Sequence, residues 1–214
     1  MTNRQHLFSA LIIAAIVVLP HLYILPSFTY SIPLLILAWF GLKSTNETFA
    51  DTGFRFNRFT FKALGIGILC AILILSFMQL VFFPVLELMV ELDDTQVDLY
   101  DFIRASPWQF ALTVVLGWLI GGLYEELVFH GFIFTRLEKM LPGKYGTQLS
   151  FLITALLFGG YHVQLGAAGL INALVVGAVY LALFLRFKRN LWYAIICHGT
   201  YNTIVITLIY MDYL

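Results

Sequence analysis

Seven apolar segments divide the chain, and most of them are long enough to cross a lipid bilayer as helices. About 20 apolar residues are needed for a crossing, so the second and fifth segments are short and are expected in thin, tilted or protein-shielded positions. Hydrophobic residues make up 61% of the 214 positions and charged residues 11%, against roughly 45–50% and about 25% in soluble domains. These features predict an all-α, polytopic transmembrane helix bundle of about seven spans, or eight if an interfacial or split helix is counted. The segments lie near residues 7–25, 30–42, 63–86, 108–134, 149–164, 169–185 and 191–211.

The distribution of charge supports this division and gives it an orientation. With the N-terminus in the cytoplasm, 11 of the 12 Lys and Arg residues fall in cytoplasmic segments, and Arg104 is the exception. The acidic connection 87–101 lies on the opposite side and is expected to be a solvated loop. This asymmetry follows the positive-inside rule. The first apolar segment is too long for a cleaved signal peptide, so we expect it to remain as an anchor.

Several classes of function are disfavoured by the composition. The formal net charge is zero and no basic stripe occurs, so we expect no nucleic-acid partner. No internal repeat and no soluble region interrupt the apolar segments. We therefore expect a single integral membrane domain over residues 1–214, with membrane lipid as its surroundings.

A few ionisable and polar side chains lie inside the predicted spans, where charge is costly and usually functional. Glu126 and His130 are four residues apart and share one helical face, while Glu125 projects about 100° away from Glu126. His198 and Asn202 have the same four-residue spacing. Three helices therefore each carry a polar cluster, which is how helix bundles build interior sites. The set comprises Glu125, Glu126 and His130 in the fourth segment, His162 in the fifth, and His198 and Asn202 in the last.

These residue types are suited to hydrolysis. A glutamate beside a histidine can activate a water molecule, and a second histidine with an Asn amide can donate hydrogen bonds to an oxyanion. Glu125, His162 and His198 are equally able to act as zinc ligands, because two His and one Glu form a catalytic zinc set. A proton or ion carrier is a further alternative, since Glu and His also relay protons in membranes.

Three motifs on separate segments resemble those of the CPBP family, which includes the CAAX prenyl proteases and bacteriocin-processing or self-immunity proteins. The family pattern is E-E-x-x-x-R, then F-x-x-x-H, then H-x-x-x-N, and its counterparts here begin at Glu125, Phe158 and His198. The resemblance covers roughly residues 105–205. His130 stands where the family has arginine, and it therefore replaces a permanent cation with a group that titrates near neutrality.

The resemblance implies a role for each matching residue. Glu125 and His162 would activate the attacking water, His198 with Asn202 would hold the oxyanion, and Glu126 would support the site. His130 and Phe158 would be supporting residues.

The resemblance also implies an activity and a cellular setting. It implies an intramembrane endopeptidase of the glutamate type in the cell membrane of a prokaryote, acting on a peptide or membrane protein that is prenylated if the host makes such proteins. No cofactor is required by this mechanism, although zinc remains an alternative. The missing arginine leaves open a non-proteolytic immunity or scaffold protein of the same fold.

Overall fold

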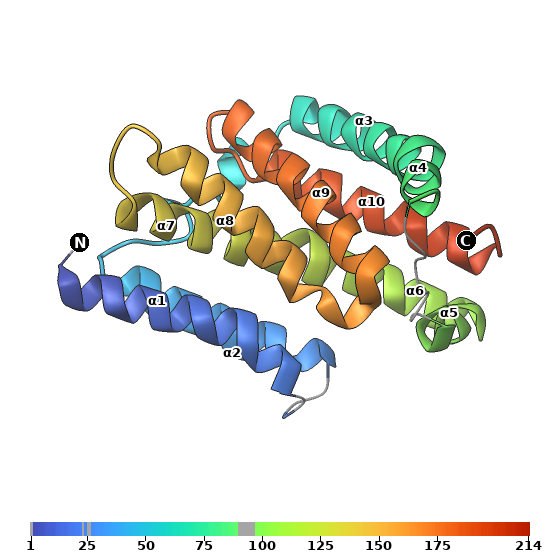
Figure 1. Cartoon of the computed structure of the whole chain (residues 1–214), viewed down its shortest axis with the longest axis horizontal. Helices are drawn as coiled ribbons and strands as arrows, with labels where there is room; N and C mark the ends of the chain where they lie inside the picture. The colour runs from blue at the N-terminus through green and yellow to red at the C-terminus, as the bar shows by residue number, and fades with distance from the viewer. Residues whose placement is uncertain (1, 23, 25–26, 90–96) are drawn as a thin grey trace.

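A computed structural model describes residues 2–22, 24, 27–89 and 97–214 of the chain, and these residues form helices joined by short connections (Figure 1). No β-strand occurs within these ranges. The longer elements are α1 (Asn3–Val18), α2 (Ser31–Lys43), α3 (Phe61–Phe77), α4 (Phe83–Glu87), α5 (Val97–Arg104), α6 (Pro107–Leu116), η5 (Gly117–Ile133), α7 (Phe134–Met140), α8 (Gly146–Tyr161), α9 (Gly166–Arg186) and α10 (Trp192–Tyr210). The predicted all-α bundle is confirmed.

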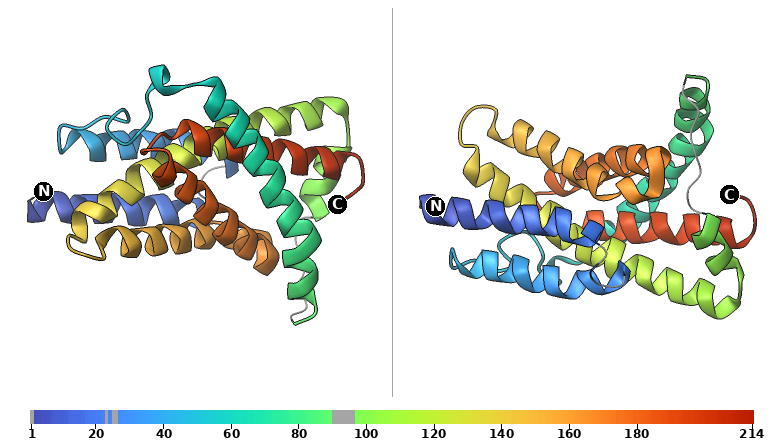
Figure 2. Two further views of the ribbon diagram at one scale, coloured as in Figure 1. Left: turned by 90° about the horizontal axis from the view of Figure 1, so that it is seen from above. Right: turned by 60° about the horizontal axis from the view of Figure 1, so that its bottom comes forward.

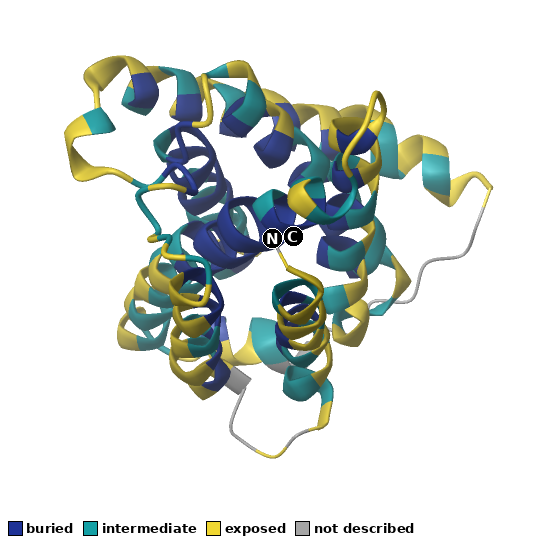
Figure 3. Cartoon of the chain, turned by 90° about the vertical axis from the view of Figure 1, so that its left-hand side faces the viewer, coloured by how far each residue is buried: buried dark blue, intermediate teal, exposed yellow. Residues whose placement is uncertain are grey.

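Within the described part of the chain, five continuous helical stretches are long and apolar enough to cross a membrane: Asn3–Leu22, Phe61–Glu87, Pro107–Met140, Val163–Arg186 and Trp192–Tyr210. The two segments predicted to be short correspond to α2, with 13 residues, and α8, with 16 residues. Large apolar side chains such as Leu11, Ile32 and Leu73 are exposed on the outside of the bundle. Figure 3 shows the exposed positions facing outward and the buried ones facing the centre. Such a surface is expected of a protein whose solvent is lipid.

The stretch formed by α6, η5 and α7 runs through the bundle, and its buried part, η5 with α7, occupies the centre. Its buried residues pack against α1, α2 and α8 in one hydrophobic cluster and against α9 and α10 in another. Helix α3 packs on the far side of α10, and Figure 2 shows α3 crossing the bundle obliquely, away from α1 and α2. The central stretch therefore has neighbours on nearly every side, and its polar side chains are removed from lipid.

The central stretch begins with a well-defined cap and then departs from α-helical geometry. Ser106 accepts a hydrogen bond from the backbone N–H of Gln109, and Pro107 occupies the first turn, where its missing N–H costs nothing. From Gly117 to Ile133 the segment is π-helical, and at its end the N–H of Phe134 bonds to the carbonyl of Phe129, five residues earlier. The expectation of regular α-helical spacing is therefore wrong for η5. Single π-helical turns are often found at functional sites, and η5, with 17 residues, is much longer than one turn.

Small residues let η5 and α10 approach closely. A Cβ added to Gly122 would lie 3.2 Å from Cα of Gly199, and one added to Gly199 would lie 2.4 Å from Cε3 of Trp118. The indole N–H of Trp118 donates to Oγ1 of Thr203 at 2.9 Å. Backbone contact of this kind is typical of membrane helices with small residues at the interface, and it positions the polar groups of the two helices opposite one another.

Part of the predicted acidic loop is helical. Residues 90–96 lie outside the described residues, but residues 97–101 belong to helix α5, so the prediction of a loop is wrong there. Ile103 is buried against Ile206 and Ile209 of α10, whereas Asp101 is exposed. This apolar face gives the helix a surface to bury, which explains why it forms.

The loops between the spans meet at one end of the bundle through buried and exposed ion pairs. The side chain of Arg136 is fully buried and donates to Oε2 of Glu47 at 2.5 Å, to the carbonyl of Gly41 at 3.1 Å and to Oγ1 of Thr45 at 2.8 Å. Lys139 also contacts the Glu47 carboxylate. Partial burial raises the pKa of Glu47, but the hydrogen bonds from Lys139, Thr45 and Arg136 lower it by more. The net result is a pKa lowered from 4.5 to about 2.

A second set of contacts joins the loop after α9 to helix α7 and to the connection before α3, at the same end. Arg189 donates to both carboxylate oxygens of Glu138, at 2.6 and 2.9 Å. Arg58 donates to the carbonyl groups of Lys188 and Arg189. Segments that the charge bias assigned to one side of the membrane therefore contact one another.

Candidate active site

A buried carboxylate joins two of the three predicted clusters. Glu126, which is fully buried, has Oε2 2.6 Å from Nδ1 of His130 and Oε1 2.9 Å from Nδ1 of His198. The first contact lies within η5 and the second connects η5 to α10. An ionised Glu126 accepts a hydrogen bond from each imidazole, so each ring carries a proton on Nδ1. The carboxylate thereby fixes the orientation of His198, whose Nε2 is left facing the other glutamate.

Glu125 lies at the meeting point of two histidines from different helices. Its Oε2 is 3.7 Å from Nε2 of His162 and 3.9 Å from Nε2 of His198. The same oxygen is buried and has no hydrogen-bond partner among the described residues. Two ring nitrogens and one carboxylate oxygen therefore border a single small space.

The protonation of His162 follows from its other contact. Nδ1 of His162 lies 2.8 Å from the carbonyl oxygen of Phe158. A carbonyl can only accept a hydrogen bond, so Nδ1 is the donor and Nε2 carries no proton in the neutral ring. The lone pair on Nε2 consequently faces Glu125. His162 follows the last residue of α8, where the chain leaves the helix, so its ring is placed by a helix end rather than by a helix interior.

Phe158 packs against all three site histidines. Its ring centroid lies 4.8 Å from that of His162, 5.5 Å from that of His130 and 6.0 Å from that of His198. A Cβ on Gly177 would lie 2.3 Å from Cδ1 of Phe158, so this glycine makes room for the aromatic ring. Phe158 thus supports the site through packing that restricts the orientation of each imidazole.

Asn202 and His198 lie side by side against the backbone of η5. A Cβ on Gly121 would be 2.3 Å from Nδ2 of Asn202 and 3.1 Å from Nε2 of His198. The Asn202 amide donates to the carbonyl of Gly117 at 3.2 Å, which fixes the amide plane and leaves its second N–H available. Two potential donors therefore face one side of the site.

Three contributors, Tyr180, Gly121 and Gly177, have no counterpart in the sequence prediction. The ring of Tyr180 stacks on His198, with centroids 4.5 Å apart and an angle of 21° between the planes. Gly121 and Gly177 leave room for Asn202 and Phe158. The only sequence signal for Tyr180 is a tyrosine within an apolar helix, and such residues most often just pack in the interior.

The donor set has the chemistry of a zinc site, because His162 and His198 both direct Nε2 towards a carboxylate oxygen. Among the described residues, however, no group of three or more His, Cys, Asp or Glu side chains is arranged to hold a metal ion. All seven residues predicted from the motifs, including His130 and Phe158, lie in contact within this one region.

Comparison with known proteins gives a match to a protein family. Residues 107–204, a little less than half of the chain, match the family model described as type II CAAX prenyl endopeptidase Rce1-like. Searches of curated proteins and of solved structures gave no match. The matched region begins at the start of α6 and ends within α10, so it contains every residue of the site described above.

Proposed function

Because residues 107–204 match the family model of type II CAAX prenyl endopeptidase Rce1-like proteins, we propose that this chain is an intramembrane endopeptidase in which Glu125 and His162 activate the attacking water. The observation that carries this proposal is the approach of His162 Nε2 and His198 Nε2 to a single oxygen of Glu125, at 3.7 and 3.9 Å. One water molecule can contact both Glu125 and His162. A base must lie within hydrogen-bonding reach of the proton it removes, and both groups border the same space.

In the proposed reaction, the water oxygen attacks the carbonyl carbon of the scissile peptide bond and its proton passes to Glu125. The charge that develops on the carbonyl oxygen is met by the available N–H of Asn202 and by Nε2–H of His198. His198 donates from Nε2 as an imidazolium, because its Nδ1–H is already bonded to Glu126. When the C–N bond breaks, Glu125 returns the proton to the leaving amine, which completes hydrolysis without a covalent intermediate.

Glu126 stabilises the charged form of His198 in this proposal. A buried imidazolium is costly unless a counter-charge lies beside it, and the Glu126 carboxylate is 2.9 Å away. This is the role that the carboxylate plays in a Ser-His-Asp triad, where it orients the imidazole and stabilises its protonated form. His130 provides the second donor to Glu126 in place of the arginine of the family motif.

The proposed surroundings are the cell membrane of a prokaryote, and the proposed substrate is a peptide or membrane protein whose scissile bond can enter the bundle. A lipidated substrate, including a prenylated one, would be retained in the same membrane as the enzyme. Burial of the site among helices supports substrates that arrive from within the bilayer.

The direct test uses the purified full-length protein in lipid nanodiscs with membrane-tethered reporter peptides, prenylated and unprenylated. We expect cleavage by the wild type and a loss of at least about 10³-fold for Glu125→Gln, since the base and the proton donor are the same group. Glu138→Gln, which removes a carboxylate paired with Arg189 outside the site, should retain activity. Cleavage by Glu125→Gln at the wild-type rate would overturn the proposal. If the wild type cleaves nothing while Glu125→Gln still complements a cellular phenotype, the scaffold or immunity role is favoured.

The metal-free form of the mechanism has its own test. We expect less than stoichiometric zinc by elemental analysis of active protein, and unchanged rates after treatment with a chelator. One zinc per chain, with activity lost on chelation and restored by zinc, would assign Glu125, His162 and His198 to a metal centre instead. That outcome would preserve the endopeptidase assignment and change only the source of the activated water.

A further inference from the structure

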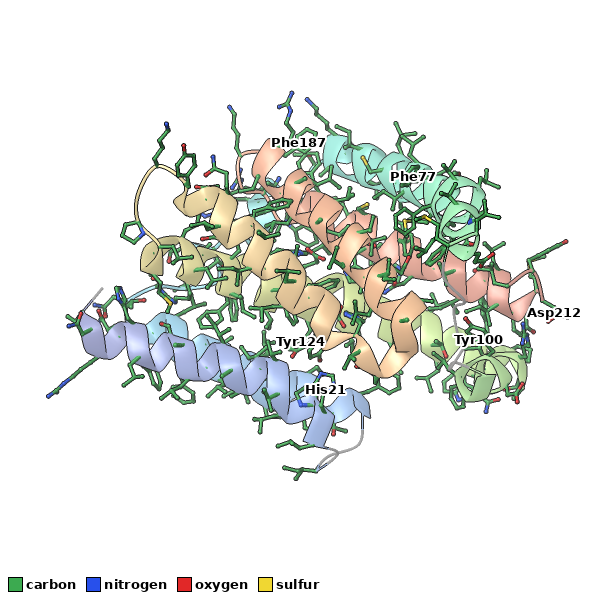
Figure 4. All side chains as sticks on the ribbon, viewed as in Figure 1. His21, Phe77, Tyr100, Tyr124, Phe187 and Asp212 are labelled. Atoms are coloured by element: carbon green, nitrogen blue, oxygen red, sulfur yellow. The ribbon has the colours of Figure 1, made fainter. Side chains whose placement is uncertain are left out.

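Beside the active site lies a second group of polar side chains, formed by His21, Tyr124 and Tyr161. Tyr124 precedes Glu125 and Tyr161 precedes His162 in the chain. His21 belongs to the 3₁₀ turn Leu19–Leu22 that continues α1, so it comes from a part of the chain outside the family match. The rings of His21 and Tyr161 are 5.9 Å apart and meet edge to face. Figure 4 labels His21 beyond the end of α1 and Tyr124 in η5.

Two polar atoms of this group are buried and unsatisfied in hydrogen bonding among the described residues. The hydroxyl of Tyr124, a residue that is only 4% exposed, and Nε2 of His21 have no hydrogen-bond partner among the described residues. Leaving such a group unpaired usually costs about 1–3 kcal/mol, so unpaired buried groups call for an explanation. Tyr161 is only partly buried, and its hydroxyl lies near that of Tyr124.

The position of the group relative to the site fits a bound peptide. The ring of Tyr161 lies 5.9 Å from that of His21 and 5.4 Å from that of His162. The two ring-to-ring separations together are no longer than three or four residues of an extended peptide, since each residue spans about 3.3 Å. A substrate whose scissile bond lies at Glu125 therefore reaches His21 within a few residues.

The chemistry of the group favours a neutral ligand with both donors and acceptors. Each tyrosine hydroxyl and a neutral imidazole can donate and accept, and none of the three is a fixed cation. A carboxylate at this point would lie near Glu125 with no Arg or Lys among these three residues to compensate it. A peptide backbone instead presents one N–H and one C=O per residue, and inside a membrane these groups need partners from the protein.

We propose that His21, Tyr124 and Tyr161 bind the main chain of the extended substrate next to the scissile bond, so that the N-terminal helix completes the substrate-binding site. This inference rests on the proposed endopeptidase function and specifies how its substrate is held. The N-terminal helix then contributes to catalysis by positioning the peptide, while the reacting groups all come from residues 107–204.

The test pairs protein variants with backbone-modified substrates. A reporter peptide is prepared with a single amide-to-ester replacement at each of the four positions on either side of the scissile bond. In the wild type we expect one position beyond the bond to lose about 5- to 10-fold in kcat/KM, the effect of one hydrogen bond. Tyr124→Phe should lower kcat/KM for the all-amide peptide by a similar factor and abolish the additional effect of that ester. His21→Gln serves as a second variant, with an effect at the same or the adjacent position.

Matched controls separate this role from general destabilisation. His6→Gln removes the histidine of α1, and Tyr193→Phe removes a hydroxyl from a buried tyrosine that stacks on Phe187. Both should leave the ester profile of the wild type unchanged. If Tyr124→Phe and His21→Gln show the full wild-type ester effect, the inference is overturned. If these variants instead remove a preference for a free C-terminal carboxylate over a C-terminal amide, the group binds a carboxylate and the inference is likewise wrong.

A binding measurement keeps the inference separate from the proposed function. Glu125→Gln protein in nanodiscs is titrated with a fluorescent all-amide peptide and with its ester analogue. We expect the ester to bind about 5-fold more weakly to Glu125→Gln, and the two peptides to bind equally to the Glu125→Gln/Tyr124→Phe double variant. Peptide binding that shows this coupling, without cleavage by the wild type, would contradict the proposed function alone. Cleavage without coupling would contradict the inference alone.

Discussion

The Glu126 carboxylate lies 2.9 Å from Nδ1 of His198, across the interface between η5 and α10, and its other oxygen lies 2.6 Å from Nδ1 of His130. This contact orients the His198 ring so that Nε2 faces Glu125. In the proposed mechanism it also provides the counter-charge for the His198 imidazolium. The second glutamate of the pair therefore acts on the site through a histidine from another helix.

Replacing Glu126 with Gln should reduce kcat strongly while preserving the fold. The amide keeps the size of the side chain but removes the negative charge that stabilises protonated His198. We expect kcat for a cleavable reporter to fall by about 10²- to 10⁴-fold, with a smaller change in KM, as when the carboxylate of a catalytic triad is neutralised. Rates are measured in nanodiscs beside Glu138→Gln as the control. An unchanged kcat would mean that His198 does not act as an imidazolium.

His130 should be replaceable by a residue that still donates to Glu126. His130→Gln retains an N–H donor, whereas His130→Ala leaves the Glu126 carboxylate with His198 alone and opens a cavity beside Phe158. Loss of a residue that orients a catalytic group typically costs about 10- to 100-fold, so we expect that loss for the alanine variant and a milder loss for the glutamine variant. Equal activity of the two variants, with equal thermal stability, would argue against a donor role.

Gly121→Ala should displace side chains of the site without changing the charge of the site or opening a cavity in it. The new Cβ would lie 2.3 Å from Nδ2 of Asn202 and 3.1 Å from Nε2 of His198, so both proposed oxyanion donors must move. We expect kcat/KM to fall by at least about 10²-fold, since small displacements of catalytic groups have large effects.

Gly160→Ala provides the matched control for this glycine, because a Cβ there meets no atom within 4 Å. It should keep its activity and gain a little stability, by about 0.5–1 kcal/mol, from the better helix propensity of alanine. Similar losses in both variants would show that the effect is not specific to the donors.

Glu47→Gln should destabilise the protein and change its response to acid. The pKa of Glu47 is lowered from 4.5 to about 2 in the folded state, so its contribution is complete above about pH 4.5 and is lost as the pH falls towards 2. Removing its charge leaves the buried Arg136 without a carboxylate partner, which should cost about 1–3 kcal/mol because Glu47 itself is partly exposed.

The measurement for Glu47 is thermal unfolding in detergent at pH 7 and at pH 3. The Tm of the wild type should be lower at pH 3 than at pH 7. The Tm of Glu47→Gln should be below that of the wild type at pH 7 and should fall by less between pH 7 and pH 3. Asp101→Asn, on the exposed face of α5, should behave like wild type. An unaltered Tm at pH 7 for Glu47→Gln would show that Arg136 is adequately compensated by Thr45 and the Gly41 carbonyl.

The sequence by itself determined the class of fold and the members of the candidate site. Runs of apolar residues specify spanning helices because only structures that satisfy their own backbone hydrogen bonds are stable in lipid. Glu125, Glu126, His162, His198 and Asn202 were identifiable because ionisable and amide groups are conspicuous in such runs. The i,i+4 contact between Glu126 and His130 was predictable because it lies within one helical turn.

The tertiary structure decided which glutamate contacts which histidine. Glu126 reaches across to His198 and Glu125 faces His162, and this division depends on the π-helical path of η5 and on its close approach to α10 at Gly121 and Gly122. Neither is readable from residue spacing, because both arise from helix–helix packing. The placement of His21 beside Tyr161 has the same origin: these residues are distant in sequence, and only the packing of α1 on α8 brings them together.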